Sequence, residues 1–134
     1  MKKLLFLILS TILFAGEDYE LKLYEKVLPI LFSQNKISVY ADIKSEELLY
    51  DSKILILSKD CRDATFLIGK NFDNLENSCK NKPIFATSYR SFTELENSFG
   101  AFYWRKGRPQ IKFNSSNIEK FNLFLPKSLQ KYSK

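Results

Sequence analysis

The chain has 134 residues, and its 21 lysines and arginines against 15 aspartates and glutamates give a formal net charge of +6. It contains no histidine, so it lacks the commonest general base and the commonest ligand of transition metals. Its four glycines stand alone, which excludes a glycine-rich phosphate loop, and we expect neither an enzyme nor a cofactor or metal site.

The N-terminal segment MKKLLFLILSTILFAG has the three parts of a secretory signal. Two lysines precede an apolar run that ends at Phe14, and the small residues Ala15 and Gly16 follow. The run is too short to cross a hydrocarbon core of about 30 Å as a helix. We expect cleavage after Ala15. An uncleaved anchor is the alternative, because Leu13 is larger than the residue usual three positions before the cleaved bond.

Removal of residues 1 to 15 from the 134 leaves 119 residues, which is enough for one domain and too few for two. We expect a single domain over residues 16 to 134, free in an exported compartment. Two lysines leave with the signal, so the charge falls from +6 to +4. This excess is modest and spread along the chain, and an exported protein does not meet nucleic acid, so we expect no nucleic-acid partner.

Hydrophobic spacing predicts a helix over residues 19 to 32, where apolar side chains recur at steps of three and four. Residues 36 to 43, KISVYADI, are rich in β-branched side chains and predict a strand. Residues 44 to 52 predict a short helix that Ser45 caps.

The middle of the chain holds three apolar runs, at residues 53 to 58, 64 to 69 and 82 to 88. They lack alternation, which suits the strands of a parallel sheet that is covered on both faces. Residues 73 to 81 and 91 to 99 predict short helices, with capping boxes formed by Asp73 with Glu76 and by Ser91 with Glu94. Strands that alternate with short helices favour a single-domain α/β sandwich with a mixed, mostly parallel sheet.

Residues 99 to 114, FGAFYWRKGRPQIKFN, predict a β-hairpin with Lys106 and Gly107 at the centre of its turn. In this register one face collects side chains suited to the core: Phe102, Trp104, Pro109, Ile111 and Phe113. The other face collects Tyr103, Arg105, Arg108, Gln110 and Lys112. A slip of one residue would mix the two sets, so their separation supports the register. We expect most of these aromatic rings in the core, with helices after the hairpin.

The second face of the hairpin forms a small basic patch. Arg105 and Arg108 lie opposite each other beside the turn, and like charges in that position repel unless an acidic group is near. We take Tyr103, Arg105 and Lys112 as candidate partner-binding residues. A solvated sheet face without a partner is the alternative.

Cys61 and Cys79 are the two cysteines, and an oxidising compartment makes a disulfide the expected state. Cys61 lies four residues before Thr65 and Cys79 lies four before Pro83, near the starts of two predicted strands, so both belong to the same end of a parallel sheet. Closing a loop of about 19 residues stabilises by roughly 3 kcal/mol in the chain-entropy model. Two buried thiols and a reactive pair are the alternatives. Asp60 and Asp63 around Cys61 are turn formers rather than cation ligands.

Residues 100 to 133 combine a Gly-led strand, a Gly-Arg turn, a strand that ends in Ile-x-Phe-Asn, a helix and a leucine-rich tail. The corresponding residues are Gly100, Gly107, Arg108, Ile111, Phe113, Asn114, Leu123, Leu125 and Leu129. This pattern resembles the end of the YfiR family of exported regulators. Upstream, CRDATFLIG, KPIFATS and YEKVLPILF are similar to the family's strands and opening helix. The chain departs from the family at residues 103 to 105, where the family has small residues, and at Asn122, where it has glycine.

The resemblance implies a periplasmic α/β domain that binds and restrains the outer-facing sensor region of an inner-membrane signalling protein, such as a diguanylate cyclase or histidine kinase. The resemblance assigns no catalytic residues to this chain. Formation of a homodimer is a further hypothesis that the sequence does not decide. The alternative is a small periplasmic solute-binding protein, because α/β sheets place ligand crevices at the carboxyl ends of their strands. A structural protein of the envelope is the third hypothesis.

Overall fold

The computed structural model describes the backbone of residues 2 to 134 and the side chains of residues 16 and 18 to 134. The helices are α1 (Lys2–Phe32), α2 (Ile43–Leu49), α3 (Tyr89–Glu94) and α4 (Ser115–Lys120), and the 3-10 turns are η1 (Cys61–Asp63), η2 (Asn77–Cys79) and η3 (Lys127–Tyr132). The strands are β1 (Ile37–Ala41), β2 (Leu55–Leu57), β3 (Phe66–Gly69), β4 (Ile84–Ala86), β5 (Ser98–Arg105) and β6 (Arg108–Phe113).

The strands form one sheet in the order β2-β1-β3-β4-β5-β6. All neighbouring pairs are parallel except β5 and β6, which form the antiparallel hairpin. The predicted α/β fold, with a mixed and mostly parallel sheet and a C-terminal hairpin followed by helical segments, is confirmed. The order of the parallel strands is one of the two common orders of open α/β sheets.

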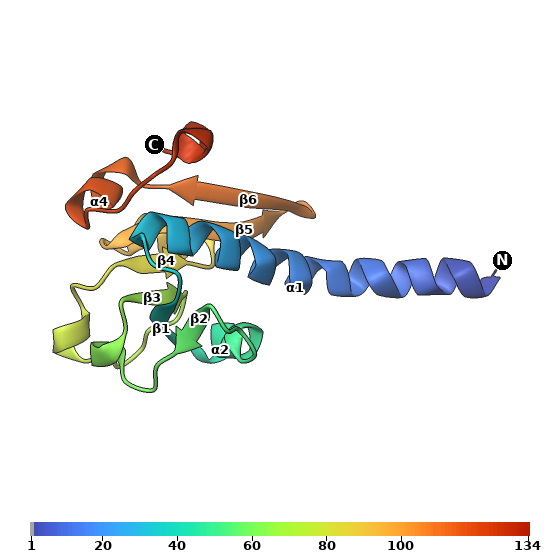
Figure 1. The fold of residues 1–134 in the computed structure, drawn as a ribbon, viewed down its shortest axis with the longest axis horizontal. Coiled ribbons are helices and arrows are strands. Elements are labelled where there is room, and N and C mark those ends of the chain that lie inside the picture. The colour runs from blue at the N-terminus through green and yellow to red at the C-terminus, as the bar shows by residue number, and fades with distance from the viewer. Residues whose placement is uncertain (1) are drawn as a thin grey trace.

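Helix α1 lies along one face of the sheet, and its N-terminal part extends beyond the domain (Figure 1). Its buried side chains pack on rings that the sheet presents to this face. Tyr24 makes edge contacts with Phe85 and Phe102, at centroid distances of 5.4 Å and 5.7 Å. Each fully buried ring stabilises the fold by roughly 1.5–3 kcal/mol before entropy is counted, so this face holds the main core.

The opposite face of the sheet carries two smaller apolar clusters. One contains the two cysteines with Leu67 and Ile84, and the other contains Ala86, Ala101 and Tyr103 under Phe92 of α3. Successive residues of β3, β4 and β5 therefore point alternately into the main core on one face of the sheet and into the smaller clusters on the other face, and both environments are buried. This explains why their sequences are continuously apolar, as expected for covered strands.

Three short helices differ from the sequence-based expectation. Helix α2 begins after Asp42 rather than Ser45, because the Asp42 carboxylate accepts a hydrogen bond from the Ser45 N–H at 2.9 Å. Helix α3 likewise begins after Ser88 and not Ser91. The helix predicted over residues 73 to 81 is wrong: only the 3-10 turn η2 forms, and Asn74 has a left-handed φ of 61° that interrupts a helix.

The hairpin has the predicted register, from Gly100 opposite Phe113 to Arg105 opposite Arg108. Lys106 and Gly107 have φ values of 50° and 76°, so both central residues of the turn are left-handed, as in a type I′ turn. The pairing that alternation and turn chemistry predict is therefore confirmed.

The expected burial along the hairpin is correct near its base and wrong near its turn. Phe102 and Phe113 are buried in the core, whereas Trp104 is 45% exposed and Pro109 is also exposed. The Trp104 ring contacts only the rings of Phe102 and Tyr19 among aromatic neighbours within the described residues. The hairpin tip reaches past the packed part of the sheet (Figure 1), so facing the core is not enough to bury a side chain there.

Residues 2 to 15 of the predicted signal segment, which spans residues 1 to 15, fall in the N-terminal part of α1, and their side chains lie outside the described residues. In the part of the chain that the structure describes, no helix is both long enough and apolar enough to span a membrane. Cleavage after Ala15 and the domain boundary at residue 16 stay predictions.

Candidate functional site

The predicted partner-binding residues of the hairpin do not form one open patch. Tyr103 is only 9% exposed, which corrects the expectation that it faces solvent. Helix α3 covers it: the rings of Tyr89 and Tyr103 lie 5.5 Å apart, and burial raises the pKa of the Tyr103 phenol. Lys112 is half-buried with its ammonium 5.5 Å from the Tyr89 ring centre. Of the three residues, Arg105 alone is fully on the surface.

The two cysteines are joined in a disulfide, with their Cα atoms 6.0 Å apart. Cys61 lies in η1 before β3 and Cys79 in η2 before β4, and these strands are neighbours in the sheet. Both sulfurs are buried against Leu67 and Ile84. The disulfide thus ties together the amino-terminal ends of two adjacent strands, at the place that the sequence predicts.

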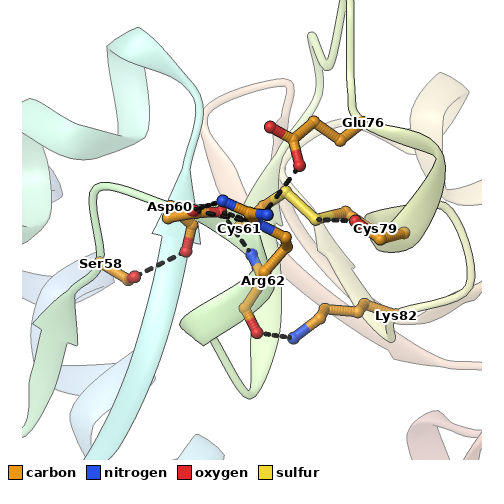
Figure 2. A network of polar contacts seen from close by, with 8 residues as sticks. Ser58, Asp60, Cys61, Arg62, Glu76, Cys79 and Lys82 are labelled. Atoms are coloured by element: carbon orange, nitrogen blue, oxygen red, sulfur yellow. Dashed lines mark hydrogen bonds and ion pairs between the residues drawn. A yellow bond between two sulfur atoms is a disulfide. The ribbon is translucent and has the colours of Figure 1, made fainter.

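A polar network surrounds the disulfide (Figure 2). Asp60 caps η1 by accepting the Arg62 N–H, and its carboxylate also pairs with the Arg62 guanidinium at 2.6 Å. Arg62 reaches Glu76 at 3.4 Å, and its carbonyl accepts a hydrogen bond from Lys82. The hydrogen bonds from Arg62 lower the pKa of Asp60 to about 2 and raise the pKa of Arg62.

This network has a structural role. The ligand atoms of Cys61, Glu76 and Cys79 lie within 4.8 Å of one another, a spacing that would suit a metal ion. However, the two sulfurs are bonded to each other and are not thiolates, which are the form of cysteine that binds metals. The contacts instead connect the loops before β3 and β4, where Asp60 acts as the cap that its position in a turn predicts.

The carboxyl ends of the parallel strands lie at the end of the sheet opposite the disulfide. They border a cavity of about 350 Å³, hereafter the carboxyl-end crevice. Lys70 and Thr87 directly follow β3 and β4, and Trp104 lies near the end of β5. The full lining is Glu20, Lys44, Ser45, Glu47, Leu48, Lys70, Thr87 and Trp104. This is the position at which open α/β sheets commonly bind ligands.

Asp42 organises one wall of the crevice. Its carboxylate accepts the N–H groups of Ser45 at 2.9 Å, Lys70 at 2.8 Å and Asn71 at 3.2 Å. Burial opposes the charge of this carboxyl, but the hydrogen bonds from Lys70, Ser45 and Asn71 outweigh it, so the pKa of Asp42 is lowered. Asp42 therefore stays ionised and holds the end of β1, the start of α2 and the loop after β3 together.

Neither the role of Asp42 nor the crevice was predicted from the sequence. The pattern Asp-x-x-Ser before an apolar helix was a usable signal for Asp42, because aspartate is among the best N-cap residues. The crevice had no such signal, because its residues come from several segments that only the sheet order brings together.

A second surface was also missed. Ile43 is 84% exposed, Tyr50 77% and Ile56 44%, and all three line one broad groove beside the edge strand β2. We call these three residues the α2/β2 surface. The apolar run containing Ile56 was expected to be covered on both faces, but β2 lies at the edge of the sheet and is incompletely covered.

No protein-family model matches the sequence, and no curated protein matches it. Among solved structures, the chain is similar to the crystal structure of a conserved domain protein from Vibrio cholerae O1 biovar El Tor, with a TM-score of 0.54 and 11% sequence identity. The match covers 88% of this chain and 60% of the other chain. At this identity the similarity shows the α/β fold alone, because one fold serves many functions.

Proposed function

We propose that the protein is a non-enzymatic periplasmic regulator that binds the outer-facing region of an inner-membrane signalling protein. The observation that carries this proposal is the α2/β2 surface. Exposed aliphatic and aromatic side chains that gather on one side of a domain mark sites of protein contact more often than ordinary solvated surface. Tyrosine is also among the residues enriched in protein interfaces.

The edge strand β2 adds to this surface. It pairs with β1 on one side, and within the described residues its other side has no strand partner. Such an edge offers unpaired N–H and C=O groups to a partner strand. A partner can therefore combine apolar contacts to Ile43, Tyr50 and Ile56 with backbone hydrogen bonds to β2. The patch of Tyr103, Arg105 and Lys112 is less suitable, because only Arg105 is fully exposed.

Export is part of the same proposal. The signal-like segment predicts it, and a disulfide suits an oxidising compartment. The class of partner comes from the resemblance of residues 100 to 133 to the YfiR family. Mass analysis of the protein recovered from the periplasm should show Gly16 at its N-terminus and no free thiols. Recovery from the cytosol with both sulfurs reduced would contradict this part of the proposal.

Crosslinking in living cells tests the partner. A photoreactive amino acid at Tyr50 should yield a covalent product with an inner-membrane signalling protein, identified by mass spectrometry. The same group at Phe124, an exposed ring outside the α2/β2 surface, is the matched control and should yield no such product. Equal crosslinking at both positions, or no membrane signalling protein in the Tyr50 product, would reject the proposed interface.

The carboxyl-end crevice favours a second candidate function, the binding of a small solute. Its volume of about 350 Å³ lies in the range of ligand pockets, and its position matches the usual ligand site of open α/β sheets. A solute at this site is compatible with a regulator, since a bound ligand can shift the affinity for a second partner.

A further inference from the structure

We infer that the carboxyl-end crevice binds a small zwitterion, a molecule with one carboxylate, one ammonium group and an aromatic or apolar body. This inference rests on the second candidate function, solute binding, and names the class of solute. The class follows from the charges of the crevice, from its backbone groups and from Trp104.

Charges of both signs line the crevice in equal number. Lys44 and Lys70 supply two ammonium groups, and Glu20 and Glu47 supply two carboxylates. Within the described residues, neither lysine side chain forms an ion pair. A ligand of one sign, such as a phosphate, would meet two groups that attract it and two that repel it. A zwitterion can place each of its charges beside the opposite one, so it suits this lining better.

Three backbone donors beside the crevice, the N–H groups of Ser45, Lys70 and Thr87, are already used. The N–H groups of Ser45 and Lys70 both donate to the Asp42 carboxylate. A ligand carboxylate therefore depends chiefly on side-chain donors: the two lysine ammonium groups and the Thr87 hydroxyl. This distinguishes the crevice from phosphate sites, in which consecutive backbone N–H groups surround the anion.

The walls that carry these side chains are firmly held. The Lys70 N–H donates to the Asp42 carboxylate, and the Lys70 carbonyl accepts a hydrogen bond from the Ser91 hydroxyl. The backbone that carries the Lys70 side chain is therefore held by two hydrogen bonds. The Thr87 N–H donates to the Gly69 carbonyl at 3.2 Å, and Glu20 accepts a hydrogen bond from the buried Tyr24 hydroxyl. A site with fixed walls loses little entropy when a ligand binds.

Trp104 provides the apolar part of the site. Its indole lines the crevice and is 45% exposed, although such a large ring gains most when it is covered. A flat or apolar ligand body that packs on the indole would cover it. Stacked or edge-to-face ring pairs contribute more than their buried area alone, so an aromatic body is favoured.

Trp104 is also the only tryptophan of the chain, so intrinsic fluorescence reports directly on the crevice. The experiment uses the protein purified as cells produce it, and it compares three probes of equal ring size. L-phenylalanine carries both charges, 3-phenylpropionate lacks the amine, and 2-phenylethylamine lacks the carboxylate. Binding is followed by tryptophan fluorescence and, in parallel, by calorimetry, which detects ligands that leave the emission unchanged.

We expect saturable binding of L-phenylalanine and weaker binding of the other two probes, by about tenfold or more for each lost charge contact. Glu47→Gln should weaken the binding of L-phenylalanine and leave that of 3-phenylpropionate unchanged or stronger. Lys44→Ala combined with Lys70→Ala should weaken both. Glu119→Gln, at an exposed position of α4 outside the crevice, is the control for a change of charge alone. Thermal unfolding of every variant checks that it is folded.

The experiment distinguishes failure of the zwitterion inference from failure of the proposed solute site. If 3-phenylpropionate or 2-phenylethylamine binds as tightly as L-phenylalanine, the zwitterion is rejected while solute binding stands. If none of the three probes binds by either method, the zwitterion inference and the proposed solute site both fail. Binding that Lys44→Ala with Lys70→Ala leaves unchanged would place the ligand elsewhere and overturn the inference.

Discussion

Gly69, at the carboxyl end of β3, lies against the side chain of Asp42, which directly follows β1. A Cβ atom placed on Gly69 would come within 2.4 Å of the Asp42 carboxyl carbon. Gly69 also has a φ of 145°, which side chains rarely allow. The glycine therefore lets the loop after β3 approach Asp42 and donate its N–H groups, and this contact shapes the wall of the carboxyl-end crevice.

Gly69→Ala should strongly destabilise the protein. The strained backbone costs on the order of 1–3 kcal/mol, and the contact with Asp42 adds to it. Gly107→Ala is the matched control, because Gly107 also has a positive φ, 76°, but a Cβ atom there would have no other atom within 4 Å. Urea unfolding should give a clearly larger loss for Gly69→Ala. Equal losses would show that the contact with Asp42 is unimportant.

Asp42→Asn removes a charge that three N–H groups stabilise. Hydrogen bonds to charged groups are each worth about 1.5–3 kcal/mol, so we expect a loss of at least that size at pH 7. The folded-state pKa of Asp42 is lowered, so its contribution is fully present above the unfolded value of about 3.9 and is lost as the pH falls through the lower folded value.

The stability difference between the wild-type protein and Asp42→Asn should therefore shrink as the pH falls below about 4. Urea unfolding at pH values of about 7, 4 and 3 measures this difference directly. The lowered pKa of Asp60 also makes the free energy of unfolding depend on pH. This contribution is present in both proteins and cancels in the comparison. A difference that stays constant across this acid range would mean that the Asp42 carboxylate gains nothing from its three donors.

The disulfide between Cys61 and Cys79 closes a loop with a sequence separation of 18. The double variant Cys61→Ala, Cys79→Ala should be less stable by about 3 kcal/mol, chiefly because the unfolded chain gains freedom. A reducing agent should destabilise the wild-type protein by a similar amount and leave the double variant unchanged. If the reducing agent shifts neither unfolding curve, the bond does not form in the purified protein.

The sequence predicted those features that depend on neighbouring residues. The hairpin register followed from the alternation between Phe102 and Phe113 and from the turn at Lys106 and Gly107, and both are local. The disulfide followed from equal distances to two strand starts. Burial depended on distant segments instead: α3 covers Tyr103, and nothing in the hairpin sequence indicates this.

The candidate sites were not predicted because they too depend on segments that are distant in the sequence. Lys44, Lys70 and Trp104 lie far apart in the sequence and meet only because the strands are ordered β2-β1-β3-β4-β5. Ile56 belongs to an apolar run like those of the central strands, and only its place on an edge strand exposes it. Strand order results from the packing of the whole chain and has no local signature, so sequence patterns predict elements better than the surfaces these elements create.

Comparing substitutions at Phe102 and Trp104 separates the effect on stability of facing the core from that of being buried in it. Both side chains project from β5 toward α1, where Phe102 contacts Tyr24 and Trp104 contacts Tyr19, but Phe102 is fully buried and Trp104 is half exposed. Phe102→Ala should cost about 3–5 kcal/mol, the usual loss for a buried aromatic side chain. Trp104→Ala should cost clearly less, because water already reaches much of the indole and less apolar area is lost. Urea unfolding of the two variants measures both losses. If Trp104→Ala proves as costly as Phe102→Ala, the indole is a core residue in solution, and the crevice loses the apolar wall on which its ligand class depends.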